Sequence, residues 1–186
     1  NSIQNFILTN EKKKAVEFLA RFARLVRHNL NASVQGRVSL AEEVQILENY
    51  LALERERFNQ KIEYRITVEE GLEEEDITLP PLLIQPYVEN AVIHGLGKKE
   101  GGGTVAIHFQ RDNGALAVTV RDNGLGFRQE EGKEPSTRHR SVGMTITEKR
   151  LELLGNGNGE AVQVEVLKGE DGEVLGTEVR VRVRTG

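Results

Sequence analysis

The sequence predicts an α+β protein in which an N-terminal helical hairpin precedes an α/β sandwich with a mixed sheet of about five strands. Long amphipathic segments fill the first 60 residues, which predicts the helices. After residue 61, short stretches alternate between apolar and polar residues, which predicts the strands. An apolar segment between the first two of these stretches predicts a buried helix, and we expect about two helices on one face of the sheet.

Composition excludes several classes of function. The 186 residues carry 25 Lys and Arg against 29 Asp and Glu, a net charge of −4, which argues against a general nucleic-acid-binding surface. Cysteine is absent, so the sequence holds neither a disulfide framework nor a thiolate metal site. No apolar run approaches the roughly 18 residues of a membrane span. The 19 glycines indicate loops that approach a ligand closely or need positive φ.

The helical hairpin is predicted from apolar periodicity and one cap. Residues 2–30 read as the first helix, the polar residues 31–35 follow, and Gly36 ends the segment. Ser39 and Glu42 form a capping box at the start of the second helix. One face of that helix is apolar except for a glutamate: Leu40, Val44, Leu47, Leu51, Glu54 and Phe58.

Such a hairpin has too small a core of its own and gains by pairing with a second copy into a four-helix bundle. We expect this dimer, and the alternative is that the hairpin packs on the domain that follows. The division expected is therefore a dimerisation region over residues 1–60 and a second domain over residues 61–186.

The strands are predicted in sequence order. The acidic run of residues 69–76 reads as a solvated loop, and Asp112-Asn113-Gly114 as a hairpin turn that needs positive φ. A helix is expected from about Pro80 to Gly95, and a later one begins after the polar residues 128–140, which resemble a lid. The expected strands cover residues 62–68, 105–109, 116–120, 162–166 and 179–183.

The helix over residues 82–95 carries polar side chains that need an explanation. Glu89 and Asn90 stand among Leu, Ile, Val and Ala, and a carboxylate buried without a partner is costly. Facing a bound cation or a polyphosphate would explain this polar edge. The simpler alternatives are an ordinary buried ion pair for Glu89 and a core hydrogen bond for Asn90.

Three further motifs suit a nucleotide. Asp122, in Asp122-x-Gly124-x-Gly126, could accept a hydrogen bond from an adenine amino group, and the two glycines let the backbone approach a ligand. The amides of Val142 and Gly143, at a helix start, suit phosphate. The fourth piece, Gly176-Thr177-Glu178, opens the last strand. Asn90 offers an oxygen to magnesium, which takes few protein ligands.

Each motif alone is common, but their order resembles a known family. PYVENAVIHG is similar to the N box, RDNGLGF to the G1 box, SVGM to the G2 box and GTEV to the last glycine motif of the Bergerat (GHKL) fold. Sensor histidine kinases, type II topoisomerases, the ninety-kilodalton heat-shock chaperone and MutL share this fold. VSLAEEVQILENYLALERERF followed by LPPLLIQPYVENAVIHGL resembles the LytS-type sensor histidine kinases, and the resemblance covers essentially the whole chain.

The resemblance implies roles for individual residues. Glu89 is the candidate catalytic residue, as an acid that activates or positions the nucleophile. Asn90 is the expected Mg²⁺ ligand, Asp122 would recognise adenine, and Thr177 would support that recognition. Lys98, Lys99, Arg138 and Arg140 could approach phosphates or be solvated surface charges. The nucleotide-binding set implied for ATP is Asn90, His94, Asp122, Gly124, Gly126, Phe127, Val142, Gly143, Met144 and Thr177.

Two departures from the family pattern stand out. Ser141 replaces the usual first glycine of the G2 box. The phosphoacceptor motif Pro-His-Phe-Leu-Phe-Asn is absent, and the resemblance places it just before the residues that Asn1, Ser2 and Ile3 match. The four histidines, His28, His94, His108 and His139, do not correspond to the phosphoacceptor.

The leading hypothesis is the kinase core of a two-component sensor. It would bind Mg-ATP, form a homodimer through the N-terminal helices, phosphorylate a histidine upstream of Asn1 and pass the phosphoryl group to an Asp of a response regulator receiver domain. The resemblance implies the cytoplasmic portion of a membrane-anchored sensor, with no nucleic-acid partner. The alternatives are an ATPase-driven clamp and a dimerisation module that binds nucleotide weakly or not at all.

Overall fold

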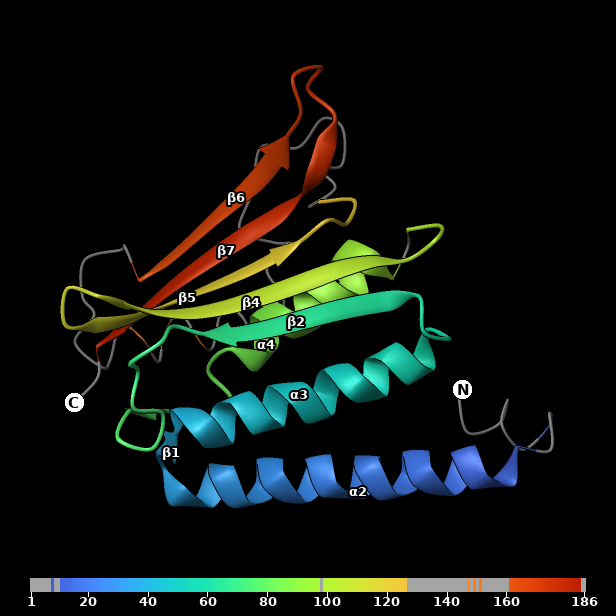
Figure 1. Ribbon diagram of the computed structural model, residues 1–186, viewed down its shortest axis with the longest axis horizontal. Helices are drawn as coiled ribbons and strands as arrows, with labels where there is room; N and C mark the ends of the chain where they lie inside the picture. Colours follow the sequence, from blue (N-terminus) through green and yellow to red (C-terminus); the bar gives the residue numbers. More distant parts are fainter. Residues whose placement is uncertain are drawn as a thin grey trace.

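The computed structural model describes residues 8, 11–97, 99–126, 147, 149, 151 and 161–184 (Figure 1). Five strands form one mixed sheet in the order β2-β4-β5-β7-β6, which confirms the predicted sheet. β2 runs parallel to β4, and the other neighbours are antiparallel. The strands are β2 (Ile62–Val68), β4 (Gly103–Asp112), β5 (Ala115–Asp122), β6 (Val162–Lys168) and β7 (Val174–Arg184).

The two faces of the sheet differ as the alternating sequence requires. On the inner face, Val105, Ile107 and Phe109 of β4 are buried with apolar residues of β5 and β7 in one core. The turn between β4 and β5 has Asn113 at φ 48° and Gly114 at φ 78°, which confirms the predicted hairpin turn.

The N-terminal hairpin consists of α2 (Lys12–Gln35) and α3 (Leu40–Arg57). The capping box is confirmed, because the Glu42 amide donates to Ser39 Oγ at 3.2 Å and the Ser39 amide to Glu42 Oε2 at 2.8 Å. The first helix continues through residues 31–35, which we had expected to lie beyond its end. It stops where Gly36 takes left-handed φ of 75°.

The hairpin packs against the sandwich, and α3 shares its core. Leu47 and Leu51 of α3 are fully buried in the same cluster as the sheet residues. A short ladder, β1 (Val38–Ser39) with β3 (Thr78–Leu79), adds a backbone link that the sequence did not predict. α2 lies on the far side of α3 from the sheet (Figure 1). No helix in the described part of the chain is long and apolar enough to cross a membrane.

The central helix begins later than predicted. Residues 81–84 form turns, and α4 (Gln85–Asn90) continues directly into a π-helix, η1 (Ala91–Leu96). Leu82 has positive φ of 56°, so an α-helix starting at Pro80 is wrong for this chain. The fully buried carboxylate of Glu43 accepts hydrogen bonds from the amides of Leu82 at 3.1 Å and Ile84 at 3.0 Å. A side chain of α3 thus caps the start of this helix.

Candidate functional site

Three of the four predicted motifs meet where η1 ends beside the ends of two strands. Asp122 is the last residue of β5, and its strand partner is Thr177 of β7. The Leu125 amide donates to the carbonyl of Gly95 at 3.0 Å, which holds the segment after β5 against η1. The N-box helix, the G1 segment and the last glycine motif therefore lie together. In the sequence, 54 residues separate Asp122 of the G1 segment from Thr177 of the last glycine motif.

Asp122 is the centre of this arrangement. Its side chain faces the helices, the residue is 5% exposed, and Oδ1 accepts a hydrogen bond from the Gly124 amide at 2.8 Å. Burial raises the pKa of Asp122, while hydrogen bonds from the backbone of Gly124 and Thr177 and the charge of Lys99 act in the opposite direction. A carboxylate accepts several hydrogen bonds, so this group suits a planar amine donor such as adenine.

Three glycines allow the backbone to close around Asp122. A Cβ on Gly95 would lie 2.8 Å from Asp122 Oδ1. A Cβ on Gly124 would collide with the backbone of Gly95, and one on Gly176 with the carbonyl oxygen of Asp122. Gly176 also has φ of 151°, which other residues rarely adopt. The site therefore requires glycine on three separate elements.

Asn123 and Lys99 fix the chain beside the carboxylate. Asn123 Oδ1 accepts from the Thr104 amide at 2.8 Å, and the Asn123 amide donates to the Thr104 carbonyl at 3.2 Å. Lys99 Nζ donates to the Asn123 carbonyl. Of the basic residues considered for phosphate contact, Lys99 is thus placed next to the Asp122 segment, and its charge reaches that carboxylate.

The polar edge of the central helix is half-buried. Glu89 and Asn90 are the last two residues of α4, and the Gln85 amide nitrogen donates to Glu89 Oε1 at 2.7 Å. His94 lies one turn later in η1 with an exposed side chain. A π-helix following Asn90 is noteworthy because single π turns occur frequently at functional sites.

The remaining predicted residues separate into two groups. Gly126 has φ of 68°, and a Cβ there would lie 2.6 Å from Val174 Cγ1, so this glycine is enforced by β7. Thr177 is buried on the Asp122 side of β7, whereas its neighbour Glu178 faces the other side of the sheet. The following residues lie outside the described part of the chain: Lys98, Phe127, Arg138, Arg140, Ser141, Val142, Gly143 and Met144.

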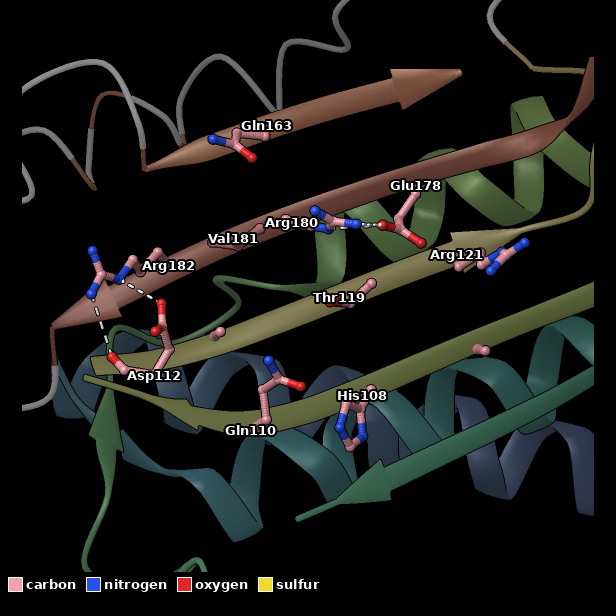
Figure 2. Close-up of a pocket in the computed structure, with 12 residues that line it drawn as sticks. His108, Gln110, Asp112, Thr119, Arg121, Gln163, Glu178, Arg180, Val181 and Arg182 are labelled. Carbon is pink, nitrogen blue, oxygen red and sulfur yellow. Dashed lines mark hydrogen bonds and ion pairs between the residues drawn. The ribbon is translucent and has the colours of Figure 1, made fainter. Parts of the chain in front are cut away.

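A different hollow, of about 650 Å³, lies on the outer face of the sheet (Figure 2). Four of its charged side chains form two ion pairs. Arg180 Nε donates to Glu178 Oε1 at 2.8 Å, and Arg182 Nε lies 3.0 Å from Asp112 Oδ2. Figure 2 shows these side chains on the face away from α4, so this hollow is separate from the Asp122 site.

Sequence reasoning did not identify several residues that shape the site. Gly95 belongs to the quoted N-box motif, and its position at the helix end was the signal available. Asn123 likewise belongs to the quoted G1 motif, and Gln85 stands four positions before its partner Glu89. Glu43 carried no such signal, because the amides that it contacts lie 39 and 41 residues away. Among the described residues, no group of three or more His, Cys, Asp or Glu side chains could hold a metal ion.

Comparison with known proteins connects this geometry to two families. Residues 1–62 match the family model described as histidine kinase. Residues 75–186 match the model described as histidine kinase-, DNA gyrase B- and HSP90-like ATPase. The second match covers more than half of the 186 residues and includes the Asp122 site.

Similar proteins support the same grouping. The chain is 33% identical to the uncharacterized protein YwpD of Bacillus subtilis, over 75% of this chain and 50% of that protein. It is 29% identical to the sensor protein LytS of Oceanobacillus iheyensis, over 80% of this chain and 27% of that protein. The chain thus spans half or less of these curated relatives.

A solved structure shares the fold. It is the histidine kinase domain of a blue-light activated histidine kinase from Erythrobacter litoralis, with a TM-score of 0.55 and 17% sequence identity. The match covers 90% of this chain and 74% of that domain.

Proposed function

Because this chain belongs to the family of histidine kinase-, DNA gyrase B- and HSP90-like ATPases, and its first 62 residues match the histidine kinase family, we propose that it binds Mg-ATP and transfers the γ-phosphate to a histidine side chain. The observation that carries the proposal is the buried Asp122 carboxylate, enclosed by glycine backbone from η1, β7 and the segment after β5.

The base of the nucleotide is assigned to the Asp122 end of the site. A buried carboxylate accepts a hydrogen bond from the exocyclic amine of adenine, while guanine presents a carbonyl oxygen at the equivalent position. Gly95 and Gly124 let η1 and the segment after β5 pack closely around the carboxylate, because neither carries a side chain. Thr177, paired with Asp122 across the strands, is the second polar group on this side.

The phosphates and the metal are assigned to the helix edge. Asn90 supplies an amide oxygen, a hard ligand that suits Mg²⁺, and the neighbouring Glu89 supplies negative charge. Magnesium completes its coordination with water and phosphate oxygens, so a single protein ligand fits this donor set. When bound, the ion would neutralise charge on the transferred phosphoryl group.

In the transfer step, the residues of this chain mainly position the reactants. A histidine imidazole is itself the nucleophile: one ring nitrogen would form a bond to the γ-phosphorus while the bond from that phosphorus to the oxygen bridging to the β-phosphate breaks, and ADP leaves. Glu89 would orient the ring through a hydrogen bond from its other N–H and could accept that proton. The resemblance places this histidine in the Pro-His-Phe-Leu-Phe-Asn motif before Asn1. The product phosphohistidine would then donate its phosphoryl group to an Asp of a response regulator receiver domain.

The surface of α2 supports dimerisation through the N-terminal helices. Spacings of three and four place the exposed apolar residues of α2 in one row, beside the buried residues that contact α3. A row of this length left in water is unfavourable, and a second hairpin would cover it. The row consists of Val16, Leu19, Phe22, Val26, Leu30 and Val34. In the proposed setting, this dimer is the cytoplasmic core of a membrane-anchored sensor.

The decisive experiment uses this chain extended before Asn1 by the Pro-His-Phe-Leu-Phe-Asn motif. Incubation with γ-labelled ATP and Mg²⁺ should give acid-labile, base-stable label on the protein, and Asp122→Asn should prevent it. Steady ATP hydrolysis without protein label, abolished by Glu89→Ala, would instead indicate an ATPase clamp. Absence of nucleotide binding by isothermal titration calorimetry would indicate a dimerisation module.

A further inference from the structure

Where α3 passes α4, each of the two helices contributes two polar side chains to the region between them. Tyr50 and Glu54 come from α3, and Gln85 and Glu89 from α4. Gln85 is 8% exposed and Tyr50 is 7% exposed. We call these four residues the α3–α4 polar cluster. Its position links the helical hairpin to the residue that we assign to phosphoryl transfer.

The charge of Glu89 acts on both α3 residues of the cluster. Burial raises the pKa of Glu54, and the charge of Glu89 raises it further. Burial likewise raises the pKa of Tyr50, with added contributions from Glu54 and Glu89. Glu89 therefore lies within electrostatic reach of both α3 residues, and its charge disfavours the ionised form of Glu54.

The two carboxylates are compensated in different ways. Glu54 receives the Arg57 guanidinium at 3.3 Å and 3.1 Å on its two oxygens. For Glu89, the Gln85 amide at 2.7 Å is the side chain that donates to it among the residues described. The i,i+4 spacing puts both groups on one helix face, and the buried amide restricts the carboxylate to a single direction.

We propose that Gln85 is a positioning residue that holds Glu89 in its reactive orientation. The inference rests on the proposed function, because it assigns a role in the same phosphoryl transfer. An amide donor stabilises and orients a carboxylate without neutralising it. A purely structural glutamine would instead affect folding and leave the chemical step unchanged.

The test is a double-mutant cycle in the full-length protein. Gln85→Met keeps the side-chain length and removes the donor. We expect it to lower the rate of histidine phosphorylation at saturating Mg-ATP by about tenfold, equivalent to about 1.4 kcal/mol, and to change the ATP dissociation constant by less than about twofold. In a Glu89→Gln background, the same change should cause no further loss of rate.

Matched controls separate this role from folding. Gln45→Met changes an exposed glutamine of α3 and should leave the rate unchanged. Thermal unfolding of every variant shows whether a lower phosphorylation rate comes from a smaller fraction of folded protein. Gln85→Leu serves as a second variant for the same check. An equal loss in the wild-type and Glu89→Gln backgrounds, or a loss confined to ATP affinity, would overturn the inference.

Failure of the proposed function gives a different result. If the wild-type protein hydrolyses ATP without labelling a histidine, kinase activity is refuted, and the same cycle measured on hydrolysis still decides whether Gln85 acts through Glu89. A wild-type protein that binds no nucleotide would overturn both proposals.

Discussion

The two ends of the helix from Gln85 to Leu96 are held in place by different kinds of contact. At the first end, side chains provide the contacts: Glu43 caps the backbone of Leu82 and Ile84, and Gln85 holds Glu89. At the second end, backbone packs on backbone, because Gly95 meets Gly124 with no side chain between them.

This difference matters for function. A contact between side chains can adjust when a neighbouring helix moves, because torsion angles absorb small displacements. Close packing of peptide groups cannot, since protein interiors have few voids and overlap is costly. We infer that the end of the helix at Gly95, where adenine is assigned, keeps one geometry, and we call it the fixed end. The position of Glu89, by contrast, changes with the position of α3. The predictions below test this contrast, beginning with the largest expected effect.

Among the substitutions considered, Gly124→Ala should lower stability and Mg-ATP affinity the most. Its new Cβ would overlap the backbone of Gly95, so η1 and the segment after β5 must separate. We expect a loss of about 3 kcal/mol in the free energy of unfolding and at least about a tenfold loss of Mg-ATP affinity. Urea unfolding and isothermal titration calorimetry measure the two quantities.

Gly114→Ala is the matched control for this change. Gly114 has φ of 78° but nothing within 4 Å of a built Cβ, so only the backbone preference is lost. We expect a cost of about 1 kcal/mol and unchanged nucleotide affinity. Wild-type ATP affinity in Gly124→Ala would show that the glycine contact does not shape the site.

Glu43→Gln tests the side-chain end. The buried carboxylate accepts two amide hydrogens, and a neutral amide presents one oxygen and an unwanted donor to them. We expect a loss of about 2–4 kcal/mol in the free energy of unfolding. Glu48→Gln, on the exposed side of α3, should change it by less than about 0.5 kcal/mol. Equal effects of the two substitutions in urea unfolding would contradict the cap.

Acidification tests the charge of Asp122 at the fixed end. Burial raises its pKa, so the carboxylate takes up its proton at a higher pH than the ordinary value of about 3.9. If the ionised form accepts the adenine amine, affinity must fall as pH falls through this raised pKa. Because the folded chain binds that proton more readily than the unfolded chain, protonation of Asp122 does not itself promote unfolding.

Adenosine is the appropriate ligand for this measurement because it lacks phosphates that titrate. Calorimetry at decreasing pH should show weakening in the wild-type protein that begins at a higher pH than an ordinary carboxyl group would cause. Asp122→Asn should bind weakly at every pH measured. Affinity that is independent of pH in the wild-type protein would remove Asp122 from adenine recognition.

Much of the fold could be predicted from the sequence because its signals are local. The Ser39–Glu42 capping box and the Asn113-Gly114 turn involve residues a few positions apart, and both predictions are confirmed. Alternation of apolar residues likewise placed all five strands of the sheet. The end of the first helix was misjudged, since the polar residues 31–35 continue it until Gly36 provides a left-handed stop.

The parts that were missed depend on contacts between distant segments. The start of α4 is set by Glu43, which lies 39 and 41 residues before the amides that it caps. The close approach of Gly95 and Gly124 likewise arises only when η1 meets the end of β5. At the site, motif spacing identified Asp122, whereas the environment that raises its pKa required the assembled fold. The assigned roles of Asp122, Glu89 and Asn90 stay predictions.

Lys99→Met should have the smallest effect, and it tests whether the Lys99 charge influences the pKa of Asp122 at the fixed end. Lys99 donates to the Asn123 carbonyl, and its positive charge favours the ionised form of Asp122. Removing that charge raises the pKa of Asp122 further, so adenosine binding should weaken at a higher pH than in the wild-type protein. We expect a displacement of less than about one pH unit and a stability loss below about 1 kcal/mol, because the ammonium is partly exposed.

Lys61→Met, on an exposed lysine before β2, should leave the pH dependence unchanged. A displacement toward lower pH in Lys99→Met would contradict the assigned charge interaction.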